Sequence, residues 1–559
     1  METPLTKSFV PKSISDTAFK YRLFYKLFDD VKKEKRSCLL VNMDTKETVS
    51  NLEILAQSEE YAKGLLRLNL TPGIDNIALI GCSTFQALAL FAAAAEIGIG
   101  FAHLFIHPPR EERITTQIKL LAPKVIVCGE GAGGHNASAL FSLLDSEPTD
   151  KISGKLPSLE HIFYDSSYKD RSPTHKSVKT LYKLKELGET VSDDQLTEAR
   201  ERVQPDFVCQ HLFTSGSAGH PKCTSRAQEA IVKLTSVGQG PLQTTMVMNM
   251  NVDTMASYVY LLYGLVGLCG TIITIPESYE ENPMKNQGKI LVETIIEKKV
   301  EQLILTMSAL GAIIDYIKEN KISIPHPLKR VFYSGQIISY QFLEDGEQLL
   351  KGVHCIGYGM TELIGIGATS FIDSSKRKVC TKEARLLPYP FATVRIADEQ
   401  NKTLDIEQIG EIQVNSPLAI KEYRLEEEQT QRLFSPDGFI KTGDAGIMFP
   451  DGTFKVLGRM NDNDRFKIYG KVEYSGPIEN IISLHPEISQ AYVVTGKRND
   501  WIGDEITCCI LAKEKSKKIP EDMLLEFCKA NGMYQRQQPA RILYFDEFPS
   551  THNERKVKL

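Results

Sequence analysis

A stretch rich in glycine and hydroxyl side chains, HLFTSGSAGHPK, runs from His211 to Lys222 at the end of an apolar segment. Its glycines allow backbone conformations in which successive N–H groups turn toward one anion. Hydroxyl groups add donors, and Lys222 adds a mobile positive charge suited to phosphate oxygens. We therefore predict a phosphate-binding loop, with an ordinary polar surface turn as the alternative. Its candidate binding residues are Thr214, Ser215, Gly216, Ser217, Gly219 and Lys222.

Two known loop templates do not fit this stretch. A Walker A loop requires a glycine where Pro221 stands and a serine or threonine where Cys223 stands. The nucleophile elbow G-x-S-x-G would require a glycine at Ser215. The loop is therefore predicted to hold phosphate in some other way.

A second glycine pattern offers a rival class of enzyme. Gly129, Gly131 and Gly134 have the G-x-G-x-x-G spacing of dinucleotide-binding folds, which makes an NAD-dependent oxidoreductase the competing interpretation. Asp165 follows about thirty residues later, beyond the usual twenty or so for the ribose-binding acid. The spacing therefore favours a plain strand-to-helix turn.

Four further stretches carry side chains suited to a nucleotide. In CIGYGMTELIGIG, a tyrosine ring can stack on a base, a threonine can donate to a phosphate and a carboxylate can hold Mg²⁺. Asp444 in FIKTGDAG can accept the hydroxyls of a ribose, and Arg459 can contact ribose or phosphate. The carboxy-terminal PSTHNERKVKL adds Arg555, Lys556 and Lys558. Each alone also has a plain structural interpretation, such as a helix cap, a turn or a surface charge.

Alternating helical and short apolar segments predict where these residues lie. The apolar runs NIALIG, KVIVCG, HIFYD, QLILT and RVFYSG predict parallel strands, and turn-rich strands follow from about Gly410. We predict an α/β fold with a large amino-terminal domain, 1–457, of mixed, mainly parallel sheets and a β-rich part. A small α+β domain, 458–559, follows, and only the family resemblance described below implies that it is mobile. The uncharged run 255–275 is predicted to be a core helix and strand rather than a membrane span.

Composition excludes several classes of function. The chain has 559 residues with 66 Lys plus Arg against 71 Asp plus Glu, so a nucleic-acid partner is not expected. Its 11 cysteines form no C-x-x-C pair, which argues against a zinc site and a disulfide framework. The first residues lack a signal-peptide core, and the chain ends in VKL. We expect a cytoplasmic or peroxisomal protein.

In their order along the chain, these motifs resemble the adenylate-forming superfamily of acyl-CoA synthetases, firefly luciferases and peptide-synthetase adenylation domains. FTSGSAGHPK is similar to its phosphate loop, and YGMTE and TGD match outright. The GR at Gly458 and Arg459, followed by Asp464 and Lys467, resembles its hinge and the start of its small domain. The resemblance implies ATP, Mg²⁺ and CoA as cofactors and a small carboxylic acid as substrate. It implies that the acid forms an acyl-adenylate and that CoA then displaces AMP.

The resemblance also implies a role for each residue. The loop residues and Lys222 would hold the β- and γ-phosphates, Thr361 would touch the α-phosphate and Glu362 would bind Mg²⁺. Tyr358 would pack on adenine, and Asp444 and Arg459 would take the ribose. Lys556 would bridge the carboxylate and the α-phosphate. Gly335, Gly359 and Lys467 complete the implied nucleotide-binding set.

The chain departs from the family pattern at several positions. Ala218 and Cys223 replace a threonine and a glycine of the loop, and Gln336 stands where a small residue lines the acyl pocket. Ser475 and Pro477 replace a usual proline and glutamate, and Arg555 falls in register with the terminal lysine, one place before Lys556. A nucleotide-binding sensor without turnover is therefore the alternative function. The acid, the acceptor and the oligomeric state stay open.

Overall fold

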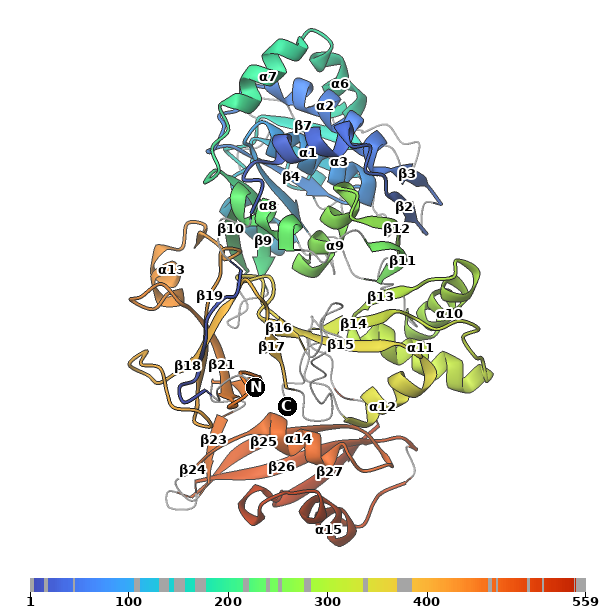
Figure 1. Cartoon of the computed structure of the whole chain (residues 1–559), viewed down its shortest axis with the longest axis vertical. Helices are drawn as coiled ribbons and strands as arrows, with labels where there is room; N and C mark the ends of the chain where they lie inside the picture. The colour runs from blue at the N-terminus through green and yellow to red at the C-terminus, as the bar shows by residue number, and fades with distance from the viewer. Residues whose placement is uncertain are drawn as a thin grey trace.

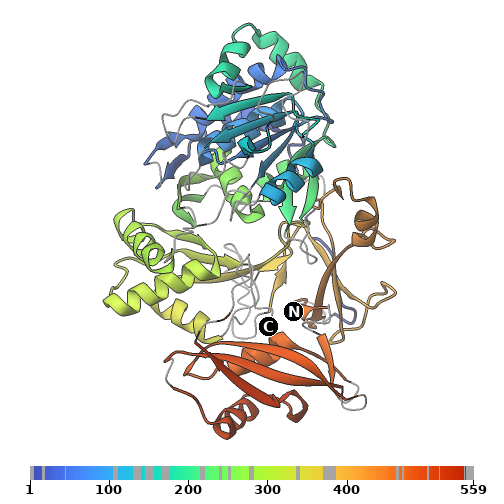
Figure 2. The same ribbon diagram turned by 180° about the vertical axis from the view of Figure 1, so that it is seen from behind.

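The computed structural model of the chain describes most residues, and these build four β-sheets with helices around them (Figure 1). The carboxy-terminal sheet lies at one end of the molecule, and the helices of the first two hundred residues lie at the other (Figure 2). The described ranges are 5–14, 19–43, 46–104, 111–129, 140–144, 156–165, 177–214, 221–237, 242–249, 254–275, 283–334, 340–368, 385–460, 465–468, 471–499, 503–514, 517–546 and 548.

The first large sheet has eight strands, and six of them run parallel to one another in its body. Two antiparallel strands complete it at one edge. The predicted strands NIALIG, KVIVCG and HIFYD all lie here. In spatial order the strands are β20 (Glu422–Tyr423), β10 (Lys222–Ala227), β9 (Val208–Thr214), β5 (Gly100–Leu104), β4 (Asn76–Ile80), β6 (Val125–Gly129), β7 (His161–Asp165) and β8 (Val178–Thr180).

The second large sheet has nine strands and is also parallel at its centre. It contains the predicted strands QLILT and RVFYSG. Its order is β17 (Leu387–Pro388), β16 (Gly367–Ala368), β15 (Val353–Tyr358), β14 (Arg330–Ser334), β13 (Gln302–Leu305), β11 (Leu242–Asn249), β12 (Cys269–Thr274), β2 (Leu39–Asn42) and β3 (Thr48–Ser50).

A five-stranded antiparallel sheet forms the β-rich part of the fold. Its order is β1 (Phe9–Val10), β18 (Thr393–Ala397), β19 (Ile409–Asn415), β21 (Ile440–Met448) and β22 (Phe454–Arg459). The predicted fold class, mainly parallel α/β sheets with a β-rich addition, is therefore confirmed.

The last described part of the chain forms a sheet with its own apolar core. Tyr474 in this sheet packs against Ala445 and Leu457 of the β-rich part. The boundary after residue 457 and the mobility of the small domain stay predictions. The strands are β23 (Arg465–Ile468), β24 (Lys471–Tyr474), β25 (Ile488–Asn499), β26 (Gly503–Ala512) and β27 (Arg541–Phe545).

Helices cover the sheets and fill the space between the two large ones. The apolar helix TFQALALFAAAAE is almost entirely buried, as a helix without a polar face must be. The helices are α1 (Phe24–Lys33), α2 (Asn51–Leu66), α3 (Thr84–Glu96), α4 (Glu111–Leu121), α6 (Leu181–Gly188), α7 (Asp193–Glu201), α8 (Gln228–Val237), α9 (Met255–Leu265), α10 (Pro283–Glu297), α11 (Met307–Asn320), α12 (Tyr340–Leu349), α13 (Glu427–Leu433), α14 (Ser475–Ile482) and α15 (Glu521–Ala530).

The uncharged run 255–275 folds as the predicted helix and strand, α9 and β12. Tyr258 of α9 packs edge-on against Phe91 and Phe101 in the core. Among the described residues, no helix is long and apolar enough to span a bilayer. The prediction of a core helix–strand pair is confirmed.

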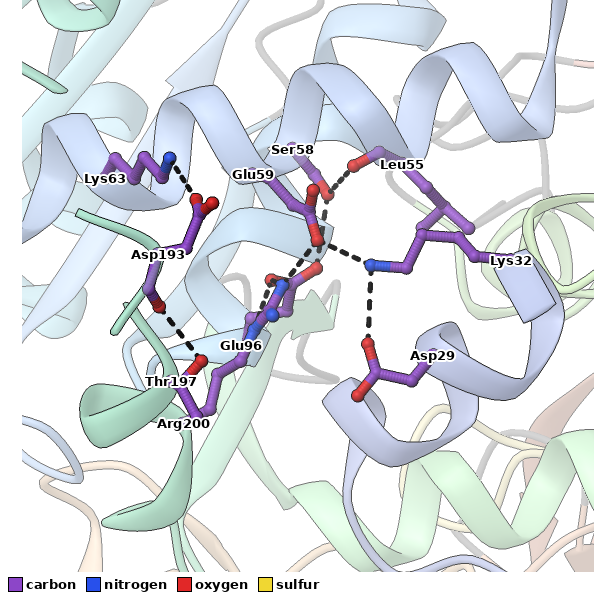
Figure 3. Close-up of polar contacts among 10 residues, drawn as sticks. All are labelled: Asp29, Lys32, Leu55, Ser58, Glu59, Lys63, Glu96, Asp193, Thr197 and Arg200. Atoms are coloured by element: carbon purple, nitrogen blue, oxygen red, sulfur yellow. Dashed lines mark hydrogen bonds and ion pairs between the residues drawn. The ribbon is translucent and has the colours of Figure 1, made fainter. Parts of the chain in front are cut away.

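A charged network ties the amino-terminal helices together (Figure 3). Arg200 of α7 donates to Glu96 at 2.5 Å and to Glu59 at 2.8 Å. Lys32 donates to the same oxygen of Glu59 at 2.5 Å. The Glu96 side chain is only 1% exposed, and burial raises its pKa despite the opposing charge of Arg200. The network therefore fixes α7, which precedes strand β9, against α2 and α3.

Replacing Arg200 with alanine should lower the free energy of unfolding by about 3 kcal/mol, because it leaves Glu96 buried without its cation. The raised pKa of Glu96 determines how this loss of unfolding free energy depends on pH. Because its pKa is raised in the folded state, protonation of Glu96 favours folding. The loss of stability in Arg200→Ala should therefore be greatest above the folded-state pKa of Glu96 and shrink as the pH falls through it. Denaturant unfolding at several pH values measures both effects.

Lys63→Ala is the matched control, because Lys63 pairs with Asp193, whose side chain is 93% exposed. Its cost should stay below about 1 kcal/mol. Equal losses in the two variants would contradict a structural role for the buried pair.

Candidate active site

The predicted phosphate loop joins two paired strands. Thr214 is the last residue of β9, Lys222 is the first residue of β10, and the two face each other in the antiparallel register. Residues 215–220 lie outside the described part of the chain. The hairpin thus brings the two described ends of the loop together at one edge of the eight-stranded sheet.

A neutral histidine anchors this hairpin below the loop. Burial lowers the pKa of His211 to about 3, so the ring carries one proton. Its Nε2 lies 2.9 Å from Oδ1 of Asn76 and its Nδ1 lies 3.2 Å from Oγ of Ser225. A side chain on Gly100 would place its Cβ 2.0 Å from Asn76 Oδ1, so glycine is required beside this contact. The structure assigns His211 to positioning the strands.

The YGMTE motif forms a tight turn after β15. Tyr358 ends the strand, and the N–H groups of Leu363 and Ile364 both donate to the carbonyl of Met360. Ile364 has φ of +69°, a conformation that is strained for a β-branched residue. A Cβ on Gly359 would lie 2.2 Å from the carbonyl oxygen of Ile364, so this position accepts only glycine. The motif therefore specifies the shape of the turn as well as its side chains.

Glu362 in this turn is joined to Lys222 through a tyrosine of another strand. The hydroxyl of Tyr423 in β20 donates to Oε1 of Glu362 at 2.5 Å. The ammonium of Lys222 lies over the same ring, 4.7 Å from its centroid, within cation–π range. Burial, and after it the charge of Glu362, raise the pKa of Tyr423, which keeps the phenol protonated and donating. One tyrosine thus positions both the carboxylate and the lysine.

A buried arginine holds the backbone of the same turn. Arg226 of β10 donates to the carbonyl oxygens of Thr361 and Leu418 and to the amide oxygen of Gln210. Burial lowers the pKa of Arg226 to about 10, and the nearby Glu362 opposes the shift. The guanidinium therefore stays charged at neutral pH and connects the loop hairpin to the YGMTE turn.

Tyr358 begins the turn and reaches the β-rich part. Its hydroxyl donates to Oδ2 of Asp444 at 2.6 Å, and Nε of Arg459 lies 3.1 Å from Oδ1 of the same carboxylate. Asp444 and Arg459 face each other in register on β21 and β22. Burial, and after it the charge of Asp444, raise the pKa of Tyr358 well above its ordinary value. Tyr358, Asp444 and Arg459 therefore form one polar cluster beside the turn.

The arrangement suits a phosphate ester with a divalent cation. Among the described residues, Tyr423 alone donates to the Glu362 side chain, so Oε2 is left for a cation. The described part holds no cluster of three metal-ligating side chains. Mg²⁺ fits such a site, because it commonly binds one or two carboxylates and takes its other ligands from phosphate and water.

Several predicted site residues lie outside the described part of the chain, so their placement is not established. Lys467 lies in β23, and nothing is described of its side chain. The undescribed residues are Ser215, Gly216, Ser217, Ala218, Gly219, Gly335, Gln336, Arg555, Lys556 and Lys558.

The sequence interpretation missed Tyr423 and Arg226. Tyr423 lies in KEYRL, a surface-like segment in which nothing marks it as buried, yet it is only 5% exposed. Arg226 had a usable signal, because a charged residue in a short strand directly after a functional loop requires a partner there. Both residues hold predicted site residues in place: Tyr423 donates to Glu362, and Arg226 donates to the carbonyl of Thr361.

The comparisons with known proteins place the chain in a family. The model of the AMP-binding enzyme family matches residues 28–424, and the chain belongs to that family. This membership replaces the oxidoreductase alternative that rested on Gly129, Gly131 and Gly134. The predicted adenylate-forming relationship is confirmed.

Individual relatives are distant. The chain is 29% identical to a long-chain-fatty-acid–CoA ligase of Thermus thermophilus, over 35% of this chain and 37% of that protein. It is 27% identical to a malonate–CoA ligase of Arabidopsis thaliana, over 49% and 44% of the two chains. The matched segments thus cover less than half the length of these two relatives.

A similar solved structure extends over nearly the whole chain. It is an amide bond synthetase from Marinactinospora thermotolerans, with a TM-score of 0.76 and 18% identity. The match covers 96% of this chain and 97% of that chain. At this identity the likeness supports the shared fold.

Tyr423→Phe should lower the free energy of unfolding by about 1–3 kcal/mol, because it leaves the buried Glu362 oxygen without its donor. The ring under Lys222 is retained, so the loss reports on the hydroxyl alone. Denaturant unfolding measures it, with Tyr182→Phe as the control because Tyr182 is 65% exposed. A stability equal to that of the parent would mean that water or another group replaces the contact at no cost.

Proposed function

We propose that the protein is an ATP-dependent carboxylate–CoA ligase. The observation that carries this proposal is the meeting of Lys222, Glu362 and the Tyr358–Asp444–Arg459 cluster around one turn. The family match and the relatives named as CoA ligases support it. Those two relatives are named for a long-chain fatty acid and for malonate, so they leave the acid of this chain open.

In the proposed first step, an oxygen of the carboxylate attacks the α-phosphorus of ATP. The bond to the bridging oxygen breaks, pyrophosphate leaves and an acyl-adenylate forms. Lys222 and the loop residues 214–219 would hold the β- and γ-phosphates, and Thr361 would donate to the α-phosphate. Mg²⁺ held by Glu362 would neutralise phosphate charge. Positioning and charge neutralisation then supply the catalysis, without a protein nucleophile.

The Tyr358–Asp444–Arg459 cluster would bind the nucleoside. Asp444 can accept from both ribose hydroxyls, while Arg459 balances its charge and Tyr358 offers its ring to adenine. Because the Tyr358 hydroxyl already donates to Asp444, ring and carboxylate hold each other in place. We propose that this contact preorganises the ribose site before ATP enters.

In the proposed second step, the thiol of CoA attacks the acyl carbonyl, loses its proton to solvent and displaces AMP. We propose that the domain 458–559 rotates between the steps, presenting Lys556 for adenylation and then the face near Lys467 for thioester formation. The alternative is a nucleotide-binding sensor without turnover, which the departures at Ala218, Cys223, Gln336 and Arg555 motivate.

A panel of carboxylic acids, scored by pyrophosphate release with and without CoA, tests the activity. Glu362→Gln should reduce Mg²⁺-dependent release roughly 100-fold, the size of effect seen when one preorganised electrostatic group is removed. Glu428→Gln is the control, because this carboxylate is 76% exposed on α13. ATP binding without release for any acid would instead establish the sensor.

Lys556→Ala separates the two half-reactions. A lysine that bridges two anions helps only while charge concentrates at the α-phosphate, so adenylate formation should fall roughly 100- to 1000-fold. Conversion of supplied acyl-adenylate to acyl-CoA should be nearly unchanged. Arg555→Ala and Lys558→Ala should have much milder effects. Equal slowing of both half-reactions, or of neither, would show that Lys556 is not the bridging lysine.

A further inference from the structure

Three arginines are buried in the described part of the chain, and one of them differs from the others. Arg226 donates to carbonyl and amide oxygens, and Arg395 donates to Asp437 and to an amide oxygen. The third, Arg330, is 9% exposed and donates to the sulfur of Cys355 at 3.6 Å. Among the described residues no oxygen acceptor and no carboxylate pairs with its guanidinium.

Within the described ranges, the groups recorded around Arg330 are aromatic rings, phenols and a thiol rather than carboxylates. Its guanidinium lies 5.2 Å from the ring centroid of Phe332, and Tyr260 of α9 packs against that ring at 6.1 Å. Burial raises the pKa of Tyr260 to about 12, so the phenol is neutral at physiological pH. A guanidinium has five N–H donors and keeps its charge, so its isolation from water without an anion is strongly unfavourable.

A buried amide oxygen without a described partner lies on the neighbouring strand. Gln302 of β13 pairs in register with Arg330 and is 2% exposed. Its Nε2 donates to Thr244 Oγ1 at 2.8 Å, while its Oε1 has no hydrogen-bond partner within the described ranges. The Gln302 amide carries both an oxygen and an NH₂ group, so if the amide were turned it would present N–H donors on this side.

Arg330 lies on the strand beside the one that leads to the active-site turn. Its strand, β14, pairs with β15, which ends at Tyr358. A Cβ on Gly357 would lie 2.3 Å from Cζ of Phe332, so this ring covers the backbone just before the turn. Arg330 and Ser334, at opposite ends of β14, are separated by about 13 Å at the usual rise of a strand.

We propose that Arg330 binds a second carboxylate of the acid substrate, so that the protein activates a dicarboxylic acid. This inference rests on the proposed ligase function. One carboxylate reacts with ATP at the Thr361–Glu362 turn, and the other pairs with the guanidinium at the opposite end of β14. A carboxylate matches a guanidinium in a bidentate geometry and supplies the anion that the buried arginine lacks.

Matched acids test the substrate class. Wild-type protein should release pyrophosphate with one member of a series of α,ω-dicarboxylic acids of increasing length. Its kcat/KM should exceed that for the monocarboxylic acid of equal length roughly 10- to 100-fold, the range for a charge-assisted hydrogen-bonded pair. Arg330→Met should remove most of this preference and Arg330→Lys should restore part of it. A wild-type preference for the monocarboxylic acid would overturn the proposal.

Thermal unfolding gives a readout that does not depend on turnover. Replacement of an unpaired buried charge by an apolar side chain of similar volume is often neutral or stabilising, so Arg330→Met should keep or raise Tm. The preferred dicarboxylic acid should raise the Tm of the wild type but not that of Arg330→Met. A lower Tm in the variant, with equal loss of activity for both acids, would show that Arg330 is a structural core residue.

The outcomes separate this inference from the proposed function. If a dicarboxylic acid raises Tm through Arg330 but no acid supports pyrophosphate release, the binding site stands and the ligase function fails. If monocarboxylic acids are activated well and Arg330→Met leaves acid selectivity unchanged, the ligase function stands and the second carboxylate site fails.

Discussion

The turn from Tyr358 to Gly365 is the constraint on which the candidate site depends. Gly359 has no side chain, so its backbone can lie against the carbonyl oxygen of Ile364. Ile364 itself adopts a strained positive φ. Arg226 holds the turn from the loop hairpin, Tyr423 holds its Glu362 side chain, and Asp444 receives the Tyr358 hydroxyl. Contacts from three other segments offset the strain, so the turn stays in one geometry. Strain stored in this way is common where a site must be preorganised.

Much of the fold follows from local patterns in the sequence. Runs such as NIALIG and RVFYSG combine β-branched or apolar residues with a glycine at the end, and they form buried parallel strands. The run 255–275 predicts a helix followed by a strand, because glycines and threonines interrupt its apolar sequence. The order of strands within each sheet depends on contacts between distant segments. Those contacts cannot be predicted from the local pattern of a single sequence. The two-residue strand β20, which carries Tyr423, is an example.

The site residues that could be predicted are those whose side-chain types within a short motif indicate nucleotide binding. YGMTE and TGD named Tyr358, Glu362 and Asp444, and the structure brings Tyr358 and Asp444 into contact across the boundary of two sheets. Tyr423, Arg226 and Arg330 were not predicted, because their importance comes from burial and from the partners they have or lack. A buried cation such as Arg330 has the same sequence signature as any exposed arginine. Only the contacts of its guanidinium distinguish it.

We propose that the Tyr358–Gly365 turn assembles a site for reversible adenylation of a carboxylic acid. Acid-dependent exchange of labelled pyrophosphate into ATP reports on this step directly, without an acceptor thiol. Exchange should require both Mg²⁺ and a suitable acid. Asp444→Asn weakens the charge-assisted bond to Tyr358, so this variant should reduce the exchange rate roughly 10-fold. Absence of exchange with every acid, in protein shown by titration calorimetry to bind ATP, would contradict this proposal.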